Sequence, residues 1–130
     1  MTYTFTFDGN TPSKKNKKRP IINSRTKKMM FLPSLAHKEW HREALATMLL
    51  QKASAAGPFP IQRCKRVGVT LYYGDQRARD NSNTWESIAD LLVDAGILKD
   101  DAWQITGPTY QLPQFRKGRP GWVAVIEVES

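Results

Sequence analysis

The chain has 130 residues, of which 40% are hydrophobic, and it carries a formal net charge of +8 and one cysteine. This length is enough for one domain with a hydrophobic core and too short for two domains of ordinary size. The composition excludes a disordered chain, the lone Cys64 excludes an internal disulfide framework or a cysteine-based zinc site, and no apolar run approaches the ~20 residues of a membrane span. We therefore expect a protein of the reducing cytoplasm, without a membrane partner.

Residues 2–7 alternate aromatic residues with threonines. Tyr3, Phe5 and Phe7 fall on one face of an extended chain and the threonines on the other, which predicts a half-buried β-strand. The turn-forming sequence Asp8-Gly9-Asn10 ends this strand. The segment lacks the charged and apolar regions of a signal peptide, so we expect no cleaved leader.

A strongly basic segment follows at about residues 9–32 and is predicted to be a long loop. Long loops in small domains are usually functional or disordered. Eight basic residues without an intervening acid repel one another unless they meet a polyanion, so we expect contacts with nucleic-acid phosphates. A solvated loop without a partner is the alternative. The eight residues are Lys14, Lys15, Lys17, Lys18, Arg19, Arg25, Lys27 and Lys28.

A helix is predicted to begin at Pro33-Ser34, with Ser34 as the N-cap, and to stop at Gly57-Pro58. Its core-facing stripe at helical spacing consists of Trp40, Ala44, Leu45, Met48 and Leu49. His37 and His41 are four residues apart, so a metal pair is conceivable. Because no third ligand is near them in the sequence, we expect two surface histidines, and contact with DNA is left open.

The second half of the chain predicts one more helix and three strands. The strands cover residues 65–73, 103–112 and 122–128, and the helix covers 84–95 with Gly96 in the C-terminal capping position. The order β-α-β-α-β-β indicates a single α+β domain over residues 1–130, with a small mixed sheet and two main helices. Cys64 is expected to be an inert thiol. The phosphate loops GxxxxGKS/T and GxGxxG are both missing, so we expect no nucleotide cofactor.

Residues 77–101 hold six of the twelve acidic residues of this basic chain, namely Asp80, Glu86, Asp90, Asp94, Asp100 and Asp101. On a helix, Glu86, Asp90 and Asp94 fall within an arc of roughly 80°, opposite the apolar face. Like charges one turn apart destabilise a helix, and Mg²⁺ or Mn²⁺ would remove that repulsion. We therefore expect the acidic residues other than Asp94 to converge as metal ligands in one pocket.

A carboxylate pocket inside a positive surface is what a metal-dependent nuclease requires. The ion helps to generate hydroxide and stabilises the leaving alkoxide, while basic residues hold the nucleic acid. The structural alternative assigns Asn83 and Glu86 to a capping box, leaves Asp94 solvated, and makes Asp100 and Asp101 turn residues.

This acidic segment resembles the RusA family of Holliday junction resolvases, small endonucleases of phages and prophages. The family motif reads approximately R-x-x-D-x-D-N, then a helix with a lysine and a Leu-Asp-x-Leu element, then A-G-x-x-x-D-D. The matching residues here are Arg77, Asp80, Asn83, Asp90-Leu91-Leu92, Ala95-Gly96 and Asp100-Asp101, at the same spacings. Upstream, residues 12–16 (PSKKN) are similar to the P-S-x-N element of the family, and Pro33-Ser34 to the Pro-Ser before its first helix.

The resemblance implies a RusA-like homodimer that makes paired nicks in four-way DNA junctions during recombination and repair and requires Mg²⁺ or Mn²⁺. It assigns Asp80 to the first motif aspartate, Asp101 to the essential member of the final pair and Asp100 to its acidic neighbour. DNA contacts are expected from the basic segment, including Asn16, and from Arg77 and Arg79. The implied location is the cytoplasm of a bacterium or of a phage-infected host.

Two positions depart from the family motif: Ser82 stands in place of the second aspartate and Glu86 in place of the helix lysine. A branch of the family resembles this chain in both positions. We therefore favour compensation, in which Glu86 replaces the lost carboxylate and acts in catalysis with Asp80, Asp100 and Asp101, while Lys99 or a lysine of the basic segment replaces the lost cation. The alternative is a non-catalytic branched-DNA-binding protein with a degenerate active site.

Overall fold

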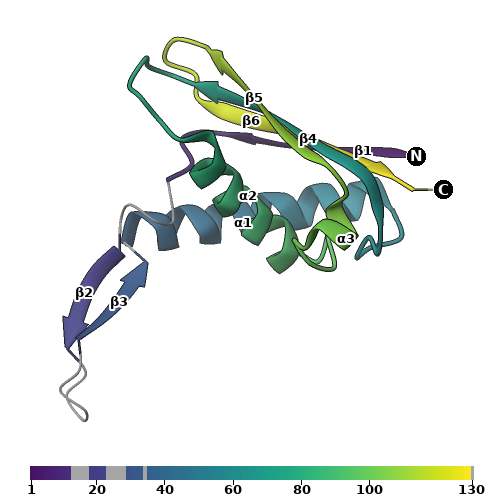
Figure 1. The fold of residues 1–130 in the computed structure, drawn as a ribbon, viewed down its shortest axis with the longest axis horizontal. Coiled ribbons are helices and arrows are strands. Elements are labelled where there is room, and N and C mark those ends of the chain that lie inside the picture. The colour runs from purple at the N-terminus through teal and green to yellow at the C-terminus, as the bar shows by residue number, and fades with distance from the viewer. Residues whose placement is uncertain (13–17, 23–28, 34, 130) are drawn as a thin grey trace.

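The computed structural model describes residues 1–12, 18–22, 29–33 and 35–129, with the backbone alone for 18–22 and 29–33. In chain order the elements are β1 (Thr2–Asp8), β2 (Lys18–Ile22), β3 (Met29–Pro33), α1 (Leu35–Ala55), β4 (Cys64–Tyr73), α2 (Asn81–Asp94), α3 (Trp103–Thr106), β5 (Thr109–Phe115) and β6 (Gly121–Val128). Figure 1 shows a sheet with α1 and α2 on one side of it and the β2–β3 hairpin projecting beyond one end. The predicted α+β class, with a mixed sheet and two main helices, is confirmed.

The main sheet has four strands in the order β1-β6-β4-β5. β6 pairs antiparallel with β1 and with β4, whereas β5 pairs parallel with β4. A parallel pair needs a crossover connection, which α2 and α3 supply between β4 and β5. Although β5 and β6 follow each other in the chain, β4 lies between them, so β5 is an edge strand. An edge position tolerates Pro113, which has no N–H to donate to a central ladder.

One face of the sheet carries the core, and α1 and α2 cover it (Figure 1). Its fully buried side chains include Phe5, Val67, Val69, Leu71, Trp122, Ala124 and Ile126. The opposite face carries Thr4, Thr6, Thr70 and Val123, and within the described residues no helix packs on it. The strict alternation predicted for residues 2–7 therefore places the aromatic residues against the helices and the threonines on the open face.

Part of the predicted loop over residues 9–32 is a hairpin instead. β2 and β3 pair antiparallel, with Lys18 opposite Pro33 and Ile22 opposite Met29. The apolar run of residues 20–22 and that of 29–32 flank a short connection, which is the pattern of a hairpin, but the surrounding lysines and arginines obscured it. Lys18 and Arg19 accordingly lie on a strand.

The second helix and the strand after it begin elsewhere than predicted. α2 starts at Asn81 rather than at residue 84. The predicted strand over 103–112 is wrong at its start, because Trp103–Thr106 form the short helix α3. Gly107 explains the change: with a φ of +65° it turns the chain, and a Cβ at this position would lie 2.8 Å from the backbone oxygen of Lys65. The chain becomes extended only after this contact.

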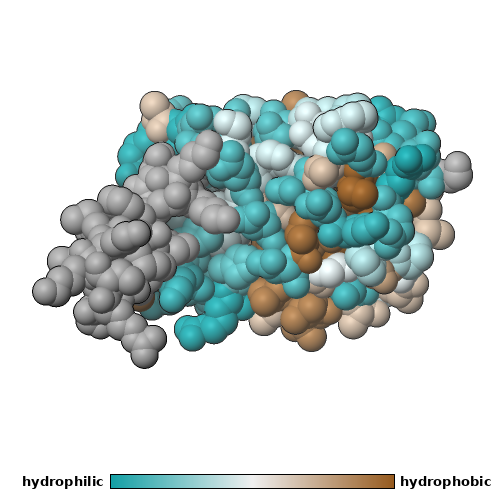
Figure 2. All heavy atoms as spheres, turned by 60° about the horizontal axis from the view of Figure 1, so that its bottom comes forward, coloured by the Kyte–Doolittle hydropathy of each residue, from teal (hydrophilic) through white to brown (hydrophobic). Residues whose placement is uncertain are grey.

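The side chains of α1 follow a narrower stripe than predicted. His37, Trp40, Ala44 and Met48 are buried, whereas Leu49 is exposed. Figure 2 shows that the helical face of the molecule is largely hydrophilic, with hydrophobic side chains gathered low on it. None of the helices in the described part of the chain is long and apolar enough to cross a membrane.

Cys64 is buried at the start of β4. Burial raises the pKa of its thiol to about 11. Because the thiolate is the reactive form of cysteine, the expectation of an inert thiol is supported, and the neighbouring Arg63 and Lys65 do not activate it.

Candidate functional site

The acidic residues of α2 lie on the face that points away from the core, as predicted. Ile88, Leu91 and Leu92 are fully buried on the opposite face. Glu86 and Asp90 are half-buried, and Asp94 is exposed near the C-terminus of the helix. The helix therefore holds its carboxylates in a line along one side, and the burial of its apolar side keeps that line in place.

Asp80 is the N-cap of α2. Its Oδ1 atom accepts hydrogen bonds from the Ser82 backbone N–H at 2.9 Å and from the Ser82 hydroxyl at 2.6 Å. A carboxylate at this position satisfies an N–H that has no partner within the helix and interacts favourably with the helix dipole. The alternative capping box of Asn83 and Glu86 is wrong, because the helix has already begun at Asn81. Ser82 thereby orients Asp80.

Asp100 and Asp101 follow a tight reversal at the other end of α2. Gly96 has a φ of +71°, and the N–H groups of Gly96 and Ile97 donate to the carbonyls of Val93 and Leu92. This is the Schellman arrangement, so the predicted capping role of Gly96 is confirmed. The reversal turns the chain back toward the exposed side of α2, where the two aspartates lie.

Three carboxylates interact around Asp101. Its backbone N–H donates to the Asp100 Oδ1 atom at 2.7 Å. Partial desolvation, a hydrogen bond with Asp100 and the negative charges of Asp100 and Asp90 raise the pKa of the Asp101 carboxyl. Proximity of like charges has this effect because it disfavours the ionised form. Asp90, Asp100 and Asp101 therefore form one electrostatic group, which we call the C-terminal acidic group.

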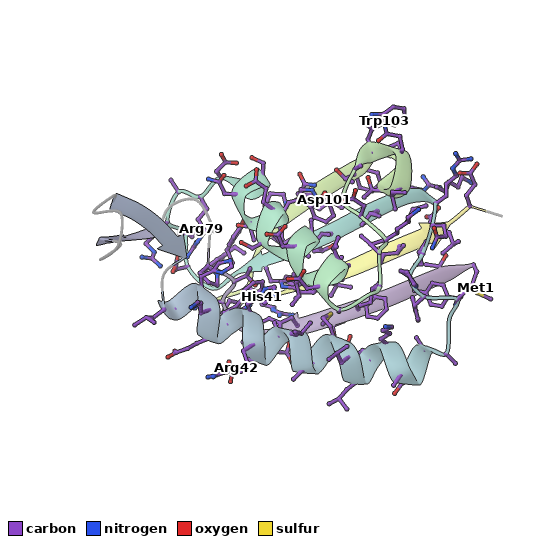
Figure 3. The ribbon with its side chains drawn as sticks, turned by 90° about the horizontal axis from the view of Figure 1, so that it is seen from below. Met1, His41, Arg42, Arg79, Asp101 and Trp103 are labelled. Atoms are coloured by element: carbon purple, nitrogen blue, oxygen red, sulfur yellow. The ribbon has the colours of Figure 1, made fainter. Side chains whose placement is uncertain are left out.

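Asp80 and the C-terminal acidic group are separated along α2. Asp90 is the tenth of the 14 residues of this helix and so lies about 15 Å from Asp80 along the helix axis at 1.5 Å per residue. In Figure 3, Arg79, the neighbour of Asp80, lies toward the β2–β3 hairpin, and Asp101 lies nearer α3. Across the described parts of the chain, no three His, Cys, Asp or Glu side chains are grouped so that they could hold a metal ion. Convergence of Asp80, Glu86 and Asp101 on a single ion stays a prediction.

The C-terminal acidic group nevertheless has the donor chemistry that Mg²⁺ prefers. Mg²⁺ usually keeps several waters and is bound through one or two carboxylates together with the phosphates of a substrate. Asp100 and Asp101 supply two adjacent carboxylates, and Asp90 adds negative charge beside them. A hard divalent cation at this position would offset the like charges of these carboxylates.

A hollow in the surface lies at the Asp80 end of α2. It has a volume of about 540 Å³ and is lined by the start of the basic segment, the first two turns of α1, the loop before α2 and the first turn of α2. The Ser87 hydroxyl donates to the Pro12 carbonyl at 2.8 Å, and the Trp122 Nε1–H donates to the Thr11 hydroxyl at 3.1 Å. These two bonds fix the start of the basic segment beside the acidic helix.

The structure describes only part of the predicted phosphate-binding set. Lys18 and Arg19 lie on β2. Lys14, Lys15, Asn16, Lys17, Arg25, Lys27 and Lys28 lie outside the described residues. Their role in DNA binding stays a prediction. The structure shows that the basic segment begins beside α2, where Thr11 and Pro12 are held by hydrogen bonds.

Arg77 and Arg79 both contact the carboxylate of Asp75, a residue that the sequence did not single out. Arg79 makes two contacts with the Asp75 carboxylate, at 2.7 and 3.0 Å, and Arg77 lies 3.3 Å from it. The Arg79 guanidinium also lies over the Tyr73 ring, and its side chain is 22% exposed, against 80% for Arg77. Hydrogen bonds from the Arg79 guanidinium and from the Arg77 N–H hold the pKa of Asp75 well below its usual range. Arg79 therefore shapes the loop, whereas Arg77 faces solvent.

The two histidines of α1 differ from the prediction. His37 is buried, not on the surface, and its ring stacks on that of His41 at a centroid distance of 6.2 Å. The His41 Nε2 atom lies 2.8 Å from the Asp94 Oδ2 atom, so Asp94 is not merely solvated. Spacing along α1 could not reveal this pair, because its acidic member comes from α2.

Comparisons with known proteins add no assignment: a scan against protein-family models gave no match, and a search among curated proteins gave no significant one.

Proposed function

We propose that this protein is a metal-dependent, structure-selective DNA endonuclease of the RusA type, which resolves four-way junctions by hydrolysing phosphodiester bonds. The observation that carries the proposal is the C-terminal acidic group of Asp90, Asp100 and Asp101, in which partial desolvation, a hydrogen bond with Asp100 and like charges raise the pKa of Asp101 within a chain of net charge +8. Such crowding is unfavourable unless a cation meets it. Perturbed carboxylates of this kind are typical of functional sites.

The proposed roles follow the positions of the residues. Asp100 and Asp101 hold Mg²⁺ or Mn²⁺, while Glu86 and Asp90 strengthen the negative field along α2. The bound ion would supply Lewis-acid stabilisation of the phosphate. Asp80, which accepts a hydrogen bond from the Ser82 hydroxyl, adds negative charge at the N-terminal end of the line of carboxylates. Arg77 and the basic segment hold flanking phosphates.

The separation of Asp80 from Asp101 has a consequence for the substrate. From Asp80 to Asp90, beside which Asp101 lies, the line of carboxylates follows α2 for about 15 Å. A duplex strand with one phosphate per 3.4 Å would present several phosphates along this length. The line therefore suits an extended DNA contact better than a small phosphate ester, and a homodimer would offer two such sites to the opposed strands of a junction.

Cleavage of a synthetic four-way junction tests this proposal. The purified protein is incubated with a junction labelled on each strand, in the presence of Mg²⁺, Mn²⁺ or EDTA. We expect paired nicks with either metal, and a loss of roughly 100-fold or more in Asp101→Asn, because removing a ligand should cost at least as much as removing its supporting residues. Glu43→Gln is the matched control: it neutralises an exposed carboxylate on α1, outside the acidic segment.

A junction-binding protein without nuclease activity is the second candidate. It is favoured by one observation, namely that the described side chains include no group of three metal-ligating residues. Tight junction binding with no nick at any concentration of Mg²⁺ or Mn²⁺ would establish this candidate and refute the nuclease. Nicks that persist in Asp101→Asn would instead show that the active site is elsewhere.

A further inference from the structure

A large hollow lies at the end of the sheet opposite the hairpin. It has a volume of about 1050 Å³. Its walls come from the start of β1, the start of β4, the end of β6 and the short helix α3. The proposed function uses none of these residues, and no motif in the sequence pointed to them.

The most prominent side chain of this hollow is Trp103. It is 75% exposed, and Figure 3 shows it projecting outward from α3, on the side of the molecule where Asp101 lies. A tryptophan offers one of the largest apolar surfaces of any side chain and usually buries it or uses it in binding. Trp103 therefore has a large flat surface that the fold of this chain does not cover.

Trp103 is not on a freely moving loop. The Gly107 N–H donates to the Trp103 carbonyl at 2.9 Å, and Thr106, at the end of the same turn, is buried. Gly107 packs against the β4 backbone so closely that no side chain would fit there, and the Val67 N–H donates to the Pro108 carbonyl at 3.0 Å. The backbone that carries the indole is thus fixed to β4, so a partner that binds there need not order the turn.

The surroundings of Trp103 suit a nucleotide. Arg63 and Lys65 line the same hollow. Among the described residues Lys65 has no acidic partner, and the only acid near Arg63 is Glu129, at 4.0 Å. These cations can meet a phosphate, while the carboxylates of Glu127 and Glu129, which also line the hollow, can accept hydrogen bonds from the amino groups of a base. Aromatic stacking next to cations is the common pattern of single-strand recognition.

The position along the chain links the hollow to the C-terminal acidic group. Trp103 is two residues beyond Asp101, a span of at most about 7 Å. A base stacked on the indole would therefore belong to a nucleotide close to the phosphate that Asp101 reaches. We propose that Trp103, with Arg63 and Lys65, forms a pocket for an unpaired nucleobase at the branch point of the DNA. The inference rests on the proposed DNA substrate and explains how a branched substrate is preferred to plain duplex.

Binding measured without metal tests the pocket apart from cleavage. In EDTA, fluorescence anisotropy compares a labelled single strand, a blunt duplex and a four-way junction with two unpaired bases at its centre. We expect Trp103→Ala to weaken single-strand binding by roughly 5- to 150-fold, because stacking contributes ~1–3 kcal/mol per base and 1.4 kcal/mol corresponds to a factor of ten. Duplex binding should change by less than twofold, and Trp103→Phe should recover most of the loss.

Two further measurements make the assignment specific. A strand that carries 2-aminopurine should change its fluorescence on binding to the wild type and to Trp103→Phe but not to Trp103→Ala. Leu50→Ala is the matched control, since Leu50 is also highly exposed, at 73%, but lies on α1. It should leave all three affinities unchanged.

The inference is overturned if Trp103→Ala binds the single strand within twofold of the wild type, or loses single-strand and duplex affinity equally. It is also overturned if the only effect of Trp103→Ala is a change of oligomeric state in sedimentation, because Trp103 would then serve a protein interface. These outcomes are distinct from failure of the nuclease. A protein that cuts no junction but loses single-strand binding in Trp103→Ala keeps the pocket, and one that cuts junctions with unchanged binding in Trp103→Ala loses it.

Discussion

The two ends of α2 carry carboxylates with opposite effects on the fold. At the N-terminus, Asp80 accepts two hydrogen bonds from Ser82 and complements the helix dipole, so its charge is stabilising. Toward the C-terminus, Asp101 lies beside Asp100 and near Asp90, and partial desolvation, a hydrogen bond with Asp100 and these like charges raise its pKa, so its charge is destabilising. The fold accounts for the first carboxylate without any ligand. The second group gains no such stabilisation from the contacts that the structure describes, and for this reason the proposal places the metal ion at that end.

Addition of Mg²⁺ should produce the largest difference in melting temperature between variants at the two ends of α2. An ion that binds the folded state alone stabilises it by about 1.4 kcal/mol when its concentration is ten times its Kd, which raises the melting temperature by a few degrees. We expect this rise in the wild type and in Asp80→Asn, but not in Asp101→Asn. Differential scanning fluorimetry in EDTA and in MgCl₂ measures it. An equal rise in wild type and Asp101→Asn would contradict a site at the C-terminal acidic group.

Removal of the Asp80 N-cap should have the next largest effect, on the free energy of unfolding. Asp80→Ala loses the oxygen that accepts from Ser82, and the loss of an N-cap costs about 1 kcal/mol. Asp80→Asn keeps an acceptor oxygen and should remain within a few tenths of a kcal/mol of the wild type. Urea denaturation of the three proteins provides the measurement. If Asp80→Ala is as stable as the wild type, the capping role assigned to Asp80 is wrong.

Neutralising Asp101 in the absence of metal should have a smaller effect, of the opposite sign. Its pKa is raised in the folded state, so protonation favours folding, and this contribution is lost as the pH rises from about 3.9, the unfolded value, through the folded pKa. At pH 7 in EDTA, Asp101→Asn should therefore be more stable than the wild type by a few tenths of a kcal/mol, the size of a like-charge repulsion at a surface.

Asp75 supplies the control for this pH dependence, because its pKa is lowered instead. Its contribution to stability is present above about pH 3.9 and is lost as the pH falls toward the folded pKa. Asp75→Asn should flatten the acid side of the stability curve, whereas Asp101→Asn should not. Thermal melts from pH 3 to 7 distinguish them, and a stabilising Asp75→Asn at neutral pH would reverse our assignment of the Arg79 contact.

The sequence predicted α2 well where its apolar period was strong and poorly where it was absent. Ile88, Leu91 and Leu92 define the buried face by spacing alone. The first turn, Asn81-Ser82-Asn83, has weak helix formers and no apolar residue, so the predicted start was late. Tertiary contacts hold this turn in place: the Tyr73 hydroxyl at the end of β4 donates to the Asn81 side chain at 2.8 Å.

The candidate site, too, could be predicted only in part. The acidic residues and their spacing were visible in the sequence, whereas the distance between Asp80 and Asp101 was not, because it depends on where the chain runs after the reversal at Gly96. Asp75 and Trp103 were missed. The Asp75-x-Arg77-x-Arg79 spacing was an available signal for the former, but nothing in the sequence distinguished Trp103 from the strand residue it was predicted to be.

The sequence by itself therefore determined the class of the fold, the apolar face of α2, the reversal at Gly96 and the concentration of opposite charges in two segments, because each depends on residues close together in the chain. Only the tertiary structure decided that β5 pairs parallel with β4, that Asp94 meets His41, and that Trp103 stands exposed beside Arg63 and Lys65. Each of these depends on contacts between segments that are far apart in the sequence, and local periodicity carries no information about such contacts.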